Sequence, residues 1–541
     1  MQMKKHALIV ASIVLPLIIA WQMVLFVGSR DIPPPETSDL TVTHPLVPDA
    51  DNAFLHFQSA TKTFVWPETN ENIYEVLSGK TNDVAFALAI INSNRQTIAE
   101  LELGTCCSHC QAPEFRGAEG DNAFIHPWNE IGRFLMLKAI YERKTGDYAA
   151  SAKTCALLIR FGDLVQKEPE TLVQQLVGVS TMMKGTWAAR ELAVEDAVTA
   201  DQLKALVRQL GAVTPVAEGM TRAMKIGYRV MAQATETVVT TRKLGGKSGY
   251  VFKPNATKLL FAALHRRIIE DLRLPYSQVR LPDRRPLPRS WLGRLWWIIQ
   301  PNSIGRMNVE VAFCNPDVYE WRSKFDTDLA GSRLLLACRA FQIEKGDLPP
   351  SLDALVPAYL EKLPLDPYND APFHYSKEKG IVYSVGWNLI DDGGTEEEIK
   401  DVCDNVCRTH PKDIIFRLRL YRLRPVDISY DPGLRLSPFA RGPPRQQHPY
   451  AKQIALPPQS CYIPPLTPHT TNKIYPTPRP GMVPTLPGLF SWQNTTSTTV
   501  DNVSGGVYAG ITQTVFRNFT QKNLLCKLLS RKRFGLHYRC C

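Results

Sequence analysis

The chain has 541 residues, 44% hydrophobic and 21% charged, a length and composition typical of two to four globular domains. Its net charge of +11 is unevenly distributed, because residues 408–541 hold 19 Lys and Arg against 4 Asp and Glu, a net +15 that leaves −4 for the rest. This distribution argues against nucleic acid as a partner of the whole protein.

An apolar run of 21 residues extends from Ala7 to Val27, long enough to cross the hydrocarbon core of a membrane as a helix. Lys4 and Lys5 precede the run, and positive charges favour the cytoplasmic side. We therefore predict that residues 1–30 are a cytoplasmic stub and a transmembrane anchor in the inner or plasma membrane. A cleaved signal peptide is the alternative, and both interpretations place the body outside the cytoplasm.

Residues 31–50 contain several prolines, and we predict a stiff spacer there. Residues 51–244 are predicted to form a helical domain, because apolar residues recur at helical spacing from Asn129 to Leu210. The turn at Gly146 and Asp147 resembles that of a tetratricopeptide hairpin, although the full repeat pattern is not met. An ordinary helical bundle and a helical repeat are both consistent with this pattern.

A short cluster of sulfur and imidazole side chains comprises Cys106, Cys107, His109 and Cys110. Adjacent ligands rarely suit a tetrahedral zinc site, and no second pair of cysteines follows at zinc-finger spacing. The cluster therefore favours a disulfide or free thiols over a metal. Disulfides are permitted if this part of the chain lies outside the cytoplasm.

Residues 245–325 are predicted to be an irregular connector rich in basic and aromatic residues. The segment from Gly245 to Ser248 ends like a phosphate-binding loop, but Thr241 stands where that motif requires its first glycine. An Arg- and Pro-rich stretch from Arg280 to Arg294 then precedes an apolar segment with Trp296 and Trp297. This segment could rest on a membrane surface or be a core helix after a linker, and both interpretations stay open.

Residues 326–420 carry the most specific pattern of the chain. A helical segment leads to a Gly346 turn, a Leu-Pro-Leu-Asp-Pro segment from Leu363, two short strands, the second ending at Gly386, and an acidic loop with Asp391 and Asp392. This series resembles the globular head of G-type pseudopilins of type II secretion. The wider arrangement of anchor, helical body and head resembles single-pass envelope proteins of planctomycete-like bacteria.

The resemblance implies a small α+β head whose acidic loop binds calcium. The ligands would be Asn388, Asp391 and Asp392, since Ca²⁺ prefers hard oxygen ligands in a flexible loop. A solvated turn without metal is the alternative. The pilin cleavage motif is missing from the N-terminus, so the resemblance does not extend to polymerisation by the pilin route.

Residues 421–541 are rich in proline and basic residues and contain no Glu, which predicts a disordered tail. The expected fold is therefore mainly α: an anchor, an extracytoplasmic helical body, a pseudopilin-like head and this tail. We expect a non-catalytic envelope protein that binds other envelope proteins, with a role related to secretion as one form of that function. An exported hydrolase is the alternative, although the familiar hydrolase motifs do not occur in their usual contexts.

Overall fold

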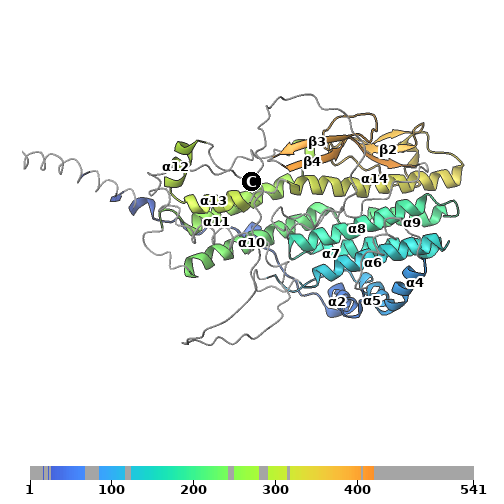
Figure 1. The fold of residues 1–541 in the computed structure, drawn as a ribbon, viewed down its shortest axis with the longest axis horizontal. Helices are drawn as coiled ribbons and strands as arrows, with labels where there is room; N and C mark the ends of the chain where they lie inside the picture. Colours follow the sequence, from blue (N-terminus) through green and yellow to red (C-terminus); the bar gives the residue numbers. More distant parts are fainter. Residues whose placement is uncertain are drawn as a thin grey trace, which may run out of the picture. The chain divides into compact units, whose positions relative to one another are not determined.

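The computed structural model describes residues 26–66, 84–115, 123–241, 249–279, 290–312, 317–403 and 406–418, together with Pro16, Gln22 and Met23. The chain divides into two units, and all described residues belong to the first. The fold below is that of the first unit, which is mainly α-helical, as the sequence predicts (Figure 1).

Helices account for most of the described residues. They are α2 (Ala53–Thr63), α4 (Val84–Ser93), α5 (Arg95–Thr105), α6 (Ile125–Lys144), α7 (Tyr148–Lys167), α8 (Leu172–Ala193), α9 (Ala200–Gly211), α10 (Val216–Thr241), α11 (Pro254–Asp271), α12 (Trp291–Ile299), α13 (Ser303–Ala312) and α14 (Asp317–Lys345). Short 3₁₀ turns lie at Ser38–Leu40, Asp49–Asp51, Tyr276–Gln278 and Leu352–Leu355.

Local sequence explains where the body helices begin and end. Gly146 has a φ of +83°, which lets the chain reverse between α6 and α7 as predicted. Asp147 then caps α7, since its carboxylate accepts a hydrogen bond from the amide of Ala150 at 3.0 Å. Thr199 and Gln202 form a reciprocal capping box at the start of α9.

The helices α7 and α8 approach so closely that their backbones touch. Gly162 and Gly178 lie at the crossing, and a Cβ atom added to Gly162 would stand 2.5 Å from the carbonyl oxygen of Gly178. Glycine at both positions removes the side chains that would hold the two helices apart. This crossing is the centre of the helical body.

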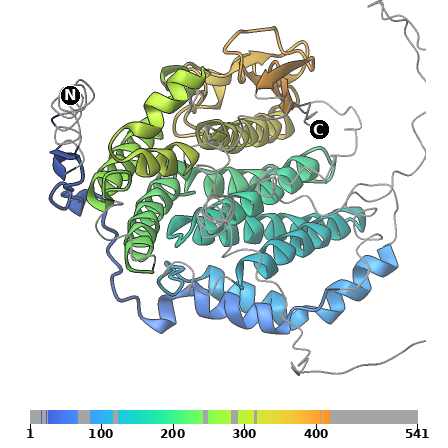
Figure 2. The same cartoon turned by 60° about the vertical axis from the view of Figure 1, so that its left-hand side comes forward.

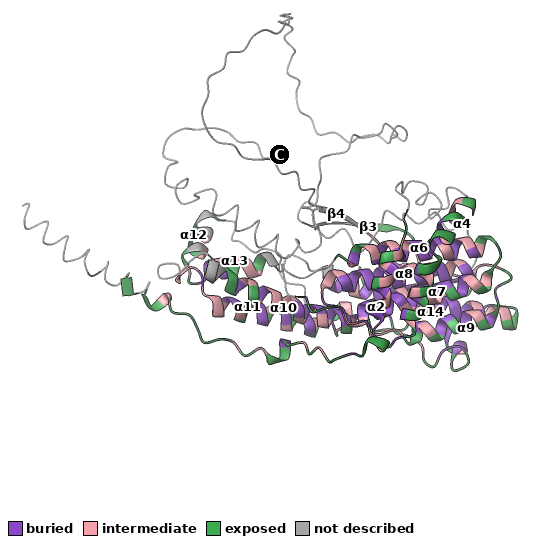
Figure 3. Cartoon of the chain, turned by 90° about the horizontal axis from the view of Figure 1, so that it is seen from below, coloured by how far each residue is buried: buried purple, intermediate pink, exposed green. Residues whose placement is uncertain are grey.

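Two hydrophobic clusters fill the first unit. One joins α2, α5, α6 and α7 around the fully buried Trp128, and Phe57 and Phe161 meet there edge to face with ring centroids 4.6 Å apart. The other joins α8, α9 and α14 and continues into the strands, where it includes Val382 and Phe416. The buried residues follow the inner faces of the packed helices (Figure 3).

The strands lie on the opposite side of α14 from the body helices (Figure 2). They are β1 (His374–Ser376), β2 (Ile381–Ser384), β3 (Glu398–Cys403), β4 (Val406–Pro411) and β5 (Ile414–Arg417). Among the described residues, β1, β2 and β5 form an antiparallel sheet in that order, and β3 and β4 form a separate hairpin. We call residues 346–418, which pack on α14, the head.

The helix α14 begins at Asp317, so the predicted boundary at residue 326 falls inside it. It contacts α8, α9 and α10 on one side and β2 and β5 on the other. One continuous helix therefore belongs to both the body and the head, which share a core.

Several sequence predictions fall outside the described residues. These are most of the apolar run from Ala7 to Val27, the Gly245–Ser248 segment, residues 280–289 of the Arg- and Pro-rich stretch, and the tail from residue 421. Within the described parts of the chain, no helix combines the length and the apolar character needed to cross a membrane.

Candidate functional site

The acidic loop of the head follows β2 and contains all three residues predicted to bind calcium. Oδ1 of Asp391 accepts hydrogen bonds from the Tyr383 hydroxyl at 3.0 Å and the Gly393 amide at 2.9 Å. His374 Nδ1 lies 3.3 Å from the other carboxylate oxygen, and its ring stacks on that of Tyr383. The pKa of Asp391 lies below its usual value, mainly because the Gly393 amide donates a hydrogen bond to the carboxylate.

Asn388 and Asp392 pair with each other on the same loop. The Asn388 side-chain amide donates to Oδ2 of Asp392 at 2.7 Å, and its oxygen accepts from the Ile390 amide at 3.2 Å. The ammonium group of Lys412 lies 3.9 Å from the other oxygen of Asp392. The pKa of Lys412 is raised mainly by the hydrogen bond between its ammonium group and Glu397.

Asp413, directly before β5, organises this loop and was not predicted from the sequence. It is 1% exposed, and its carboxylate accepts from the amides of Gly394 at 2.9 Å and Thr395 at 3.0 Å. The Asp392 amide lies at 3.5 Å from the same carboxylate. Its one signal in the sequence is its place directly before the apolar strand that closes the head.

These contacts allow a test of how well the loop suits calcium, which takes six to eight oxygen ligands. The carboxylates already accept hydrogen bonds from protein groups, and Lys412 supplies a positive charge beside Asp392. Across the described residues, no three His, Cys, Asp or Glu side chains gather as a metal site would require. The geometry fits a hydrogen-bonded turn better than a calcium cage. Calcium binding by Asn388, Asp391 and Asp392 is what the resemblance implies, and these contacts favour the alternative, a turn without metal.

The cysteine and histidine cluster directly follows the C-terminus of α5, and its three cysteines form no disulfide. Cys106, Cys107 and Cys110 are free thiols, the first exposed and the other two buried. His109 pairs with an acidic residue, since its Nδ1 lies 2.9 Å from the carboxylate of Glu168. Burial raises the pKa of Cys107 and of Cys110, which keeps both thiols protonated.

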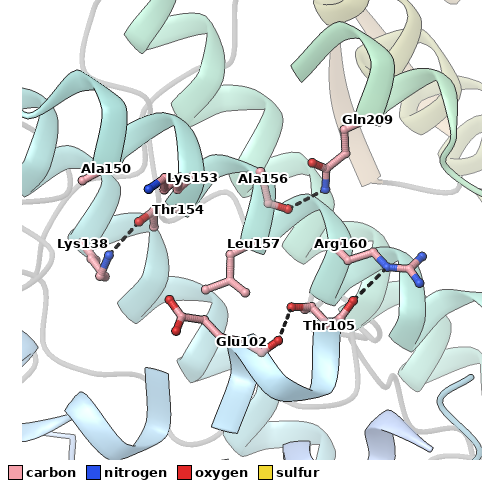
Figure 4. Close-up of a pocket in the computed structure, with 10 residues that line it drawn as sticks. All are labelled: Glu102, Thr105, Lys138, Ala150, Lys153, Thr154, Ala156, Leu157, Arg160 and Gln209. Atoms are coloured by element: carbon pink, nitrogen blue, oxygen red, sulfur yellow. Dashed lines mark hydrogen bonds between the residues drawn. The ribbon is translucent and has the colours of Figure 1, made fainter. Parts of the chain in front are cut away.

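A shallow cavity of about 420 Å³ opens on the body between α5, α6, α7 and α9 (Figure 4). Two of its basic side chains already hold other groups: Lys138 donates to Thr154 at 2.8 Å, and Arg160 donates to the carbonyl of Cys107 at 2.9 Å. The lining residues are Glu102, Thr105, Lys138, Ala150, Lys153, Thr154, Ala156, Leu157, Arg160 and Gln209. The bonds of Lys138 and Arg160 connect α7 to the elements beside it.

Comparison with models of known protein families, with characterised proteins and with solved structures found no match. The likeness of residues 326–420 to pseudopilin heads therefore stays a prediction.

Proposed function

We propose that the protein is a membrane-anchored scaffold of the cell envelope, with its body and head outside the cytoplasm, that binds other envelope proteins and does not catalyse a reaction. The apolar run from Ala7 to Val27, with Lys4 and Lys5 before it, supports the anchor and its direction. The remaining support comes from how the described parts of the chain are joined.

The observation that carries the proposal is the joint between body and head. Arg190 of α8 donates to Asp328 of α14 at 2.8 Å, and Thr186 donates to the same carboxylate at 2.6 Å. The guanidinium group of Arg190 also lies 5.7 Å from the centroid of the Phe416 ring in β5. Body, α14 and head thus share one set of contacts, an arrangement that suits a protein that presents a fixed surface to partners.

The segment that follows the apolar run is attached to the body in the same way. The carboxylate of Asp31 accepts hydrogen bonds from the amides of Asn255 at 2.7 Å and Ala256 at 3.1 Å, where its charge favours the N-terminus of α11. The guanidinium group of Arg266 in α11 donates two hydrogen bonds, of 2.8 and 2.7 Å, to the carboxylate of Asp39. The predicted spacer therefore follows the body closely, which supports a body held near the membrane.

The order of elements in the head supports a role related to secretion, because the long helix, Gly346 turn, hairpin and acidic loop follow the order of pseudopilin heads. An exported hydrolase is the alternative, and the cavity of the body is where its substrate would bind. Two of its basic groups, Lys138 and Arg160, already hydrogen-bond to neighbouring elements of the body, which favours the scaffold.

Alkaline carbonate extraction of membranes tests the anchor. We expect the full chain to stay in the membrane pellet with its first 27 residues still attached. Val14→Arg with Ile18→Arg should release it, because an arginine at the centre of a spanning helix costs about 2.5–3.5 kcal/mol. Val14→Leu with Ile18→Leu is the matched control. A released wild-type chain, or one that begins after Gly28, would contradict the anchor.

Crosslinking in intact cells tests the binding role. We expect the wild-type chain to crosslink to specific envelope proteins, and Phe416→Ala, which loosens the head from α14, to weaken those crosslinks. Glu102→Gln alters the lining of the cavity and should leave them unchanged. The hydrolase alternative would instead be supported by a substrate analogue that protects the cavity of the wild-type chain from modification.

A further inference from the structure

The helix α12 exposes one apolar face. Four of its residues are between 43% and 64% exposed although all are large and apolar: Leu292, Leu295, Trp296 and Ile299. Their spacing of three, four and seven residues places them on one side of the helix. Trp297, on another side, is half-buried, and α12 packs against α13 (Figure 1). An exposed apolar face of this kind on a folded protein marks a surface that contacts a membrane or another protein.

A chain of contacts ties the C-terminal end of α12 to the segment that leaves the apolar run. Gly28 lies against the ring of Tyr250, so closely that an added Cβ atom would be 2.6 Å from Cε2. The hydroxyl group of Tyr250 donates to the carbonyl of Ile299, the last residue of α12, at 2.9 Å. One residue thus connects the first position after Val27 with the end of the exposed helix.

The charge pattern around α12 also favours a membrane surface. In the sequence, five arginines precede or enter the helix between residues 280 and 294, against the single acidic residue Asp283. No acidic residue follows until Glu310. Positive charges beside an apolar face with tryptophan are typical of helices that lie in the headgroup region of anionic bilayers.

We propose that α12 lies in the interface of the same bilayer that the apolar run crosses, with Leu292, Leu295, Trp296 and Ile299 in its outer leaflet. This inference rests on the proposed anchor. The two contacts together, one spanning and one interfacial, fix the orientation of the body relative to the membrane. The occupant of this face is the lipid bilayer, since the tie through Tyr250 keeps α12 beside the point where the chain leaves it.

Quenching of tryptophan by brominated lipids tests the proposal. The full chain is reconstituted into vesicles of phosphatidylcholine and phosphatidylglycerol, with plain or brominated acyl chains, and the emission lost to bromine is measured. We expect Trp296→Phe to reduce the lost emission, because Trp296 contributes quenched light. Trp21→Phe reports on the apolar run in the same way. Trp187→Phe, within the packed body, is the matched control and should leave the lost emission unchanged.

The variants separate failure of this inference from failure of the anchor. If Trp21→Phe reduces the lost emission and Trp296→Phe does not, the anchor holds and α12 is not in the bilayer. Aqueous iodide provides a second test in the same vesicles. If iodide quenches the emission of Trp296, the inference is overturned, since the face would then be open to water or to a protein partner. If neither variant changes the lost emission, both the anchor and the interfacial helix are wrong.

Discussion

The ring of Phe416 in β5 lies directly on Gly331 of α14, where an added Cβ atom would stand 2.0 Å from Cε2 of the ring. Phe416 is buried, and its ring also lies under the guanidinium group of Arg190. The absence of a side chain at residue 331 thus lets the head dock on the helix that it shares with the body.

The first prediction concerns this contact. Gly331→Ala should lower the free energy of unfolding by about 1–3 kcal/mol, because the new methyl group displaces a buried ring. Adding Phe416→Leu should recover part of the loss, since the smaller side chain leaves room, and a double-mutant cycle in denaturant measures that coupling. Gly227→Ala is the control, because its Cβ would meet only His265 at 3.6 Å. Equal stability of the Gly331→Ala and Gly227→Ala variants would contradict the docking described.

The second prediction concerns the crossing of α7 and α8. Gly162→Ala places a methyl group 2.5 Å from the carbonyl oxygen of Gly178 and 2.6 Å from the amide of Met182. Backbone atoms cannot rotate away as a side chain does. We therefore expect the free energy of unfolding to fall by about 1–3 kcal/mol, with a lower melting temperature. A Gly162→Ala variant that melts with the wild type would show that the helices do not touch there.

The third prediction concerns Asp413. Asp413→Ala should destabilise the protein by about 1–3 kcal/mol, because it leaves the amides of Gly394 and Thr395 without their buried acceptor. Asp391→Asn, on the more exposed side of the loop, should cost much less. Hydrogen exchange of the Gly394 and Thr395 amides provides the direct measurement. Unchanged protection of these amides in the Asp413→Ala variant would contradict this role.

The fourth prediction concerns calcium. We expect millimolar Ca²⁺ to leave the melting temperature of the full chain unchanged, because protein donors already hold the carboxylates of the loop. A calcium site would instead stabilise the fold by RT ln(1 + [L]/Kd), about 2.7 kcal/mol at a hundredfold excess over Kd. A rise of several degrees that Asp391→Ala with Asp392→Ala abolishes would establish the site that the pseudopilin resemblance implies.

The fifth prediction concerns pH and His265. This side chain of α11 is 8% exposed beside the Tyr228 ring, and burial lowers its pKa below the usual value. The unfolded chain therefore binds the proton more readily, so stability should be lost as the pH falls below about 6.5. His265→Leu should lose less stability between pH 8 and pH 5.5 than the wild type. An identical pH dependence of the two proteins would contradict this assignment.

The sequence was most informative where structure is local. Apolar spacing and the Gly146 break predicted the helices of the body, and the two short strands expected before the acidic loop correspond to β1 and β2. The prediction of an irregular connector over residues 245–325 was wrong for α11, α12 and α13, and the β3–β4 hairpin was not predicted. The joint was not predictable, because Arg190 and Asp328 are 138 residues apart and nothing near either one indicates the other. Asp413 was missed for the same reason, since its partners Gly394 and Thr395 lie 19 and 18 residues before it in the chain.

The most direct test of the account is the side of the membrane on which the body lies. Alkaline phosphatase and green fluorescent protein are each inserted after Leu418, the last described residue of the head. We predict an active phosphatase fusion, because this enzyme folds only outside the cytoplasm. We predict no fluorescence from the green fluorescent protein fusion, because it would be exported unfolded. A fluorescent fusion with inactive phosphatase would place the body in the cytoplasm and contradict the anchor, the interfacial helix and the envelope role together.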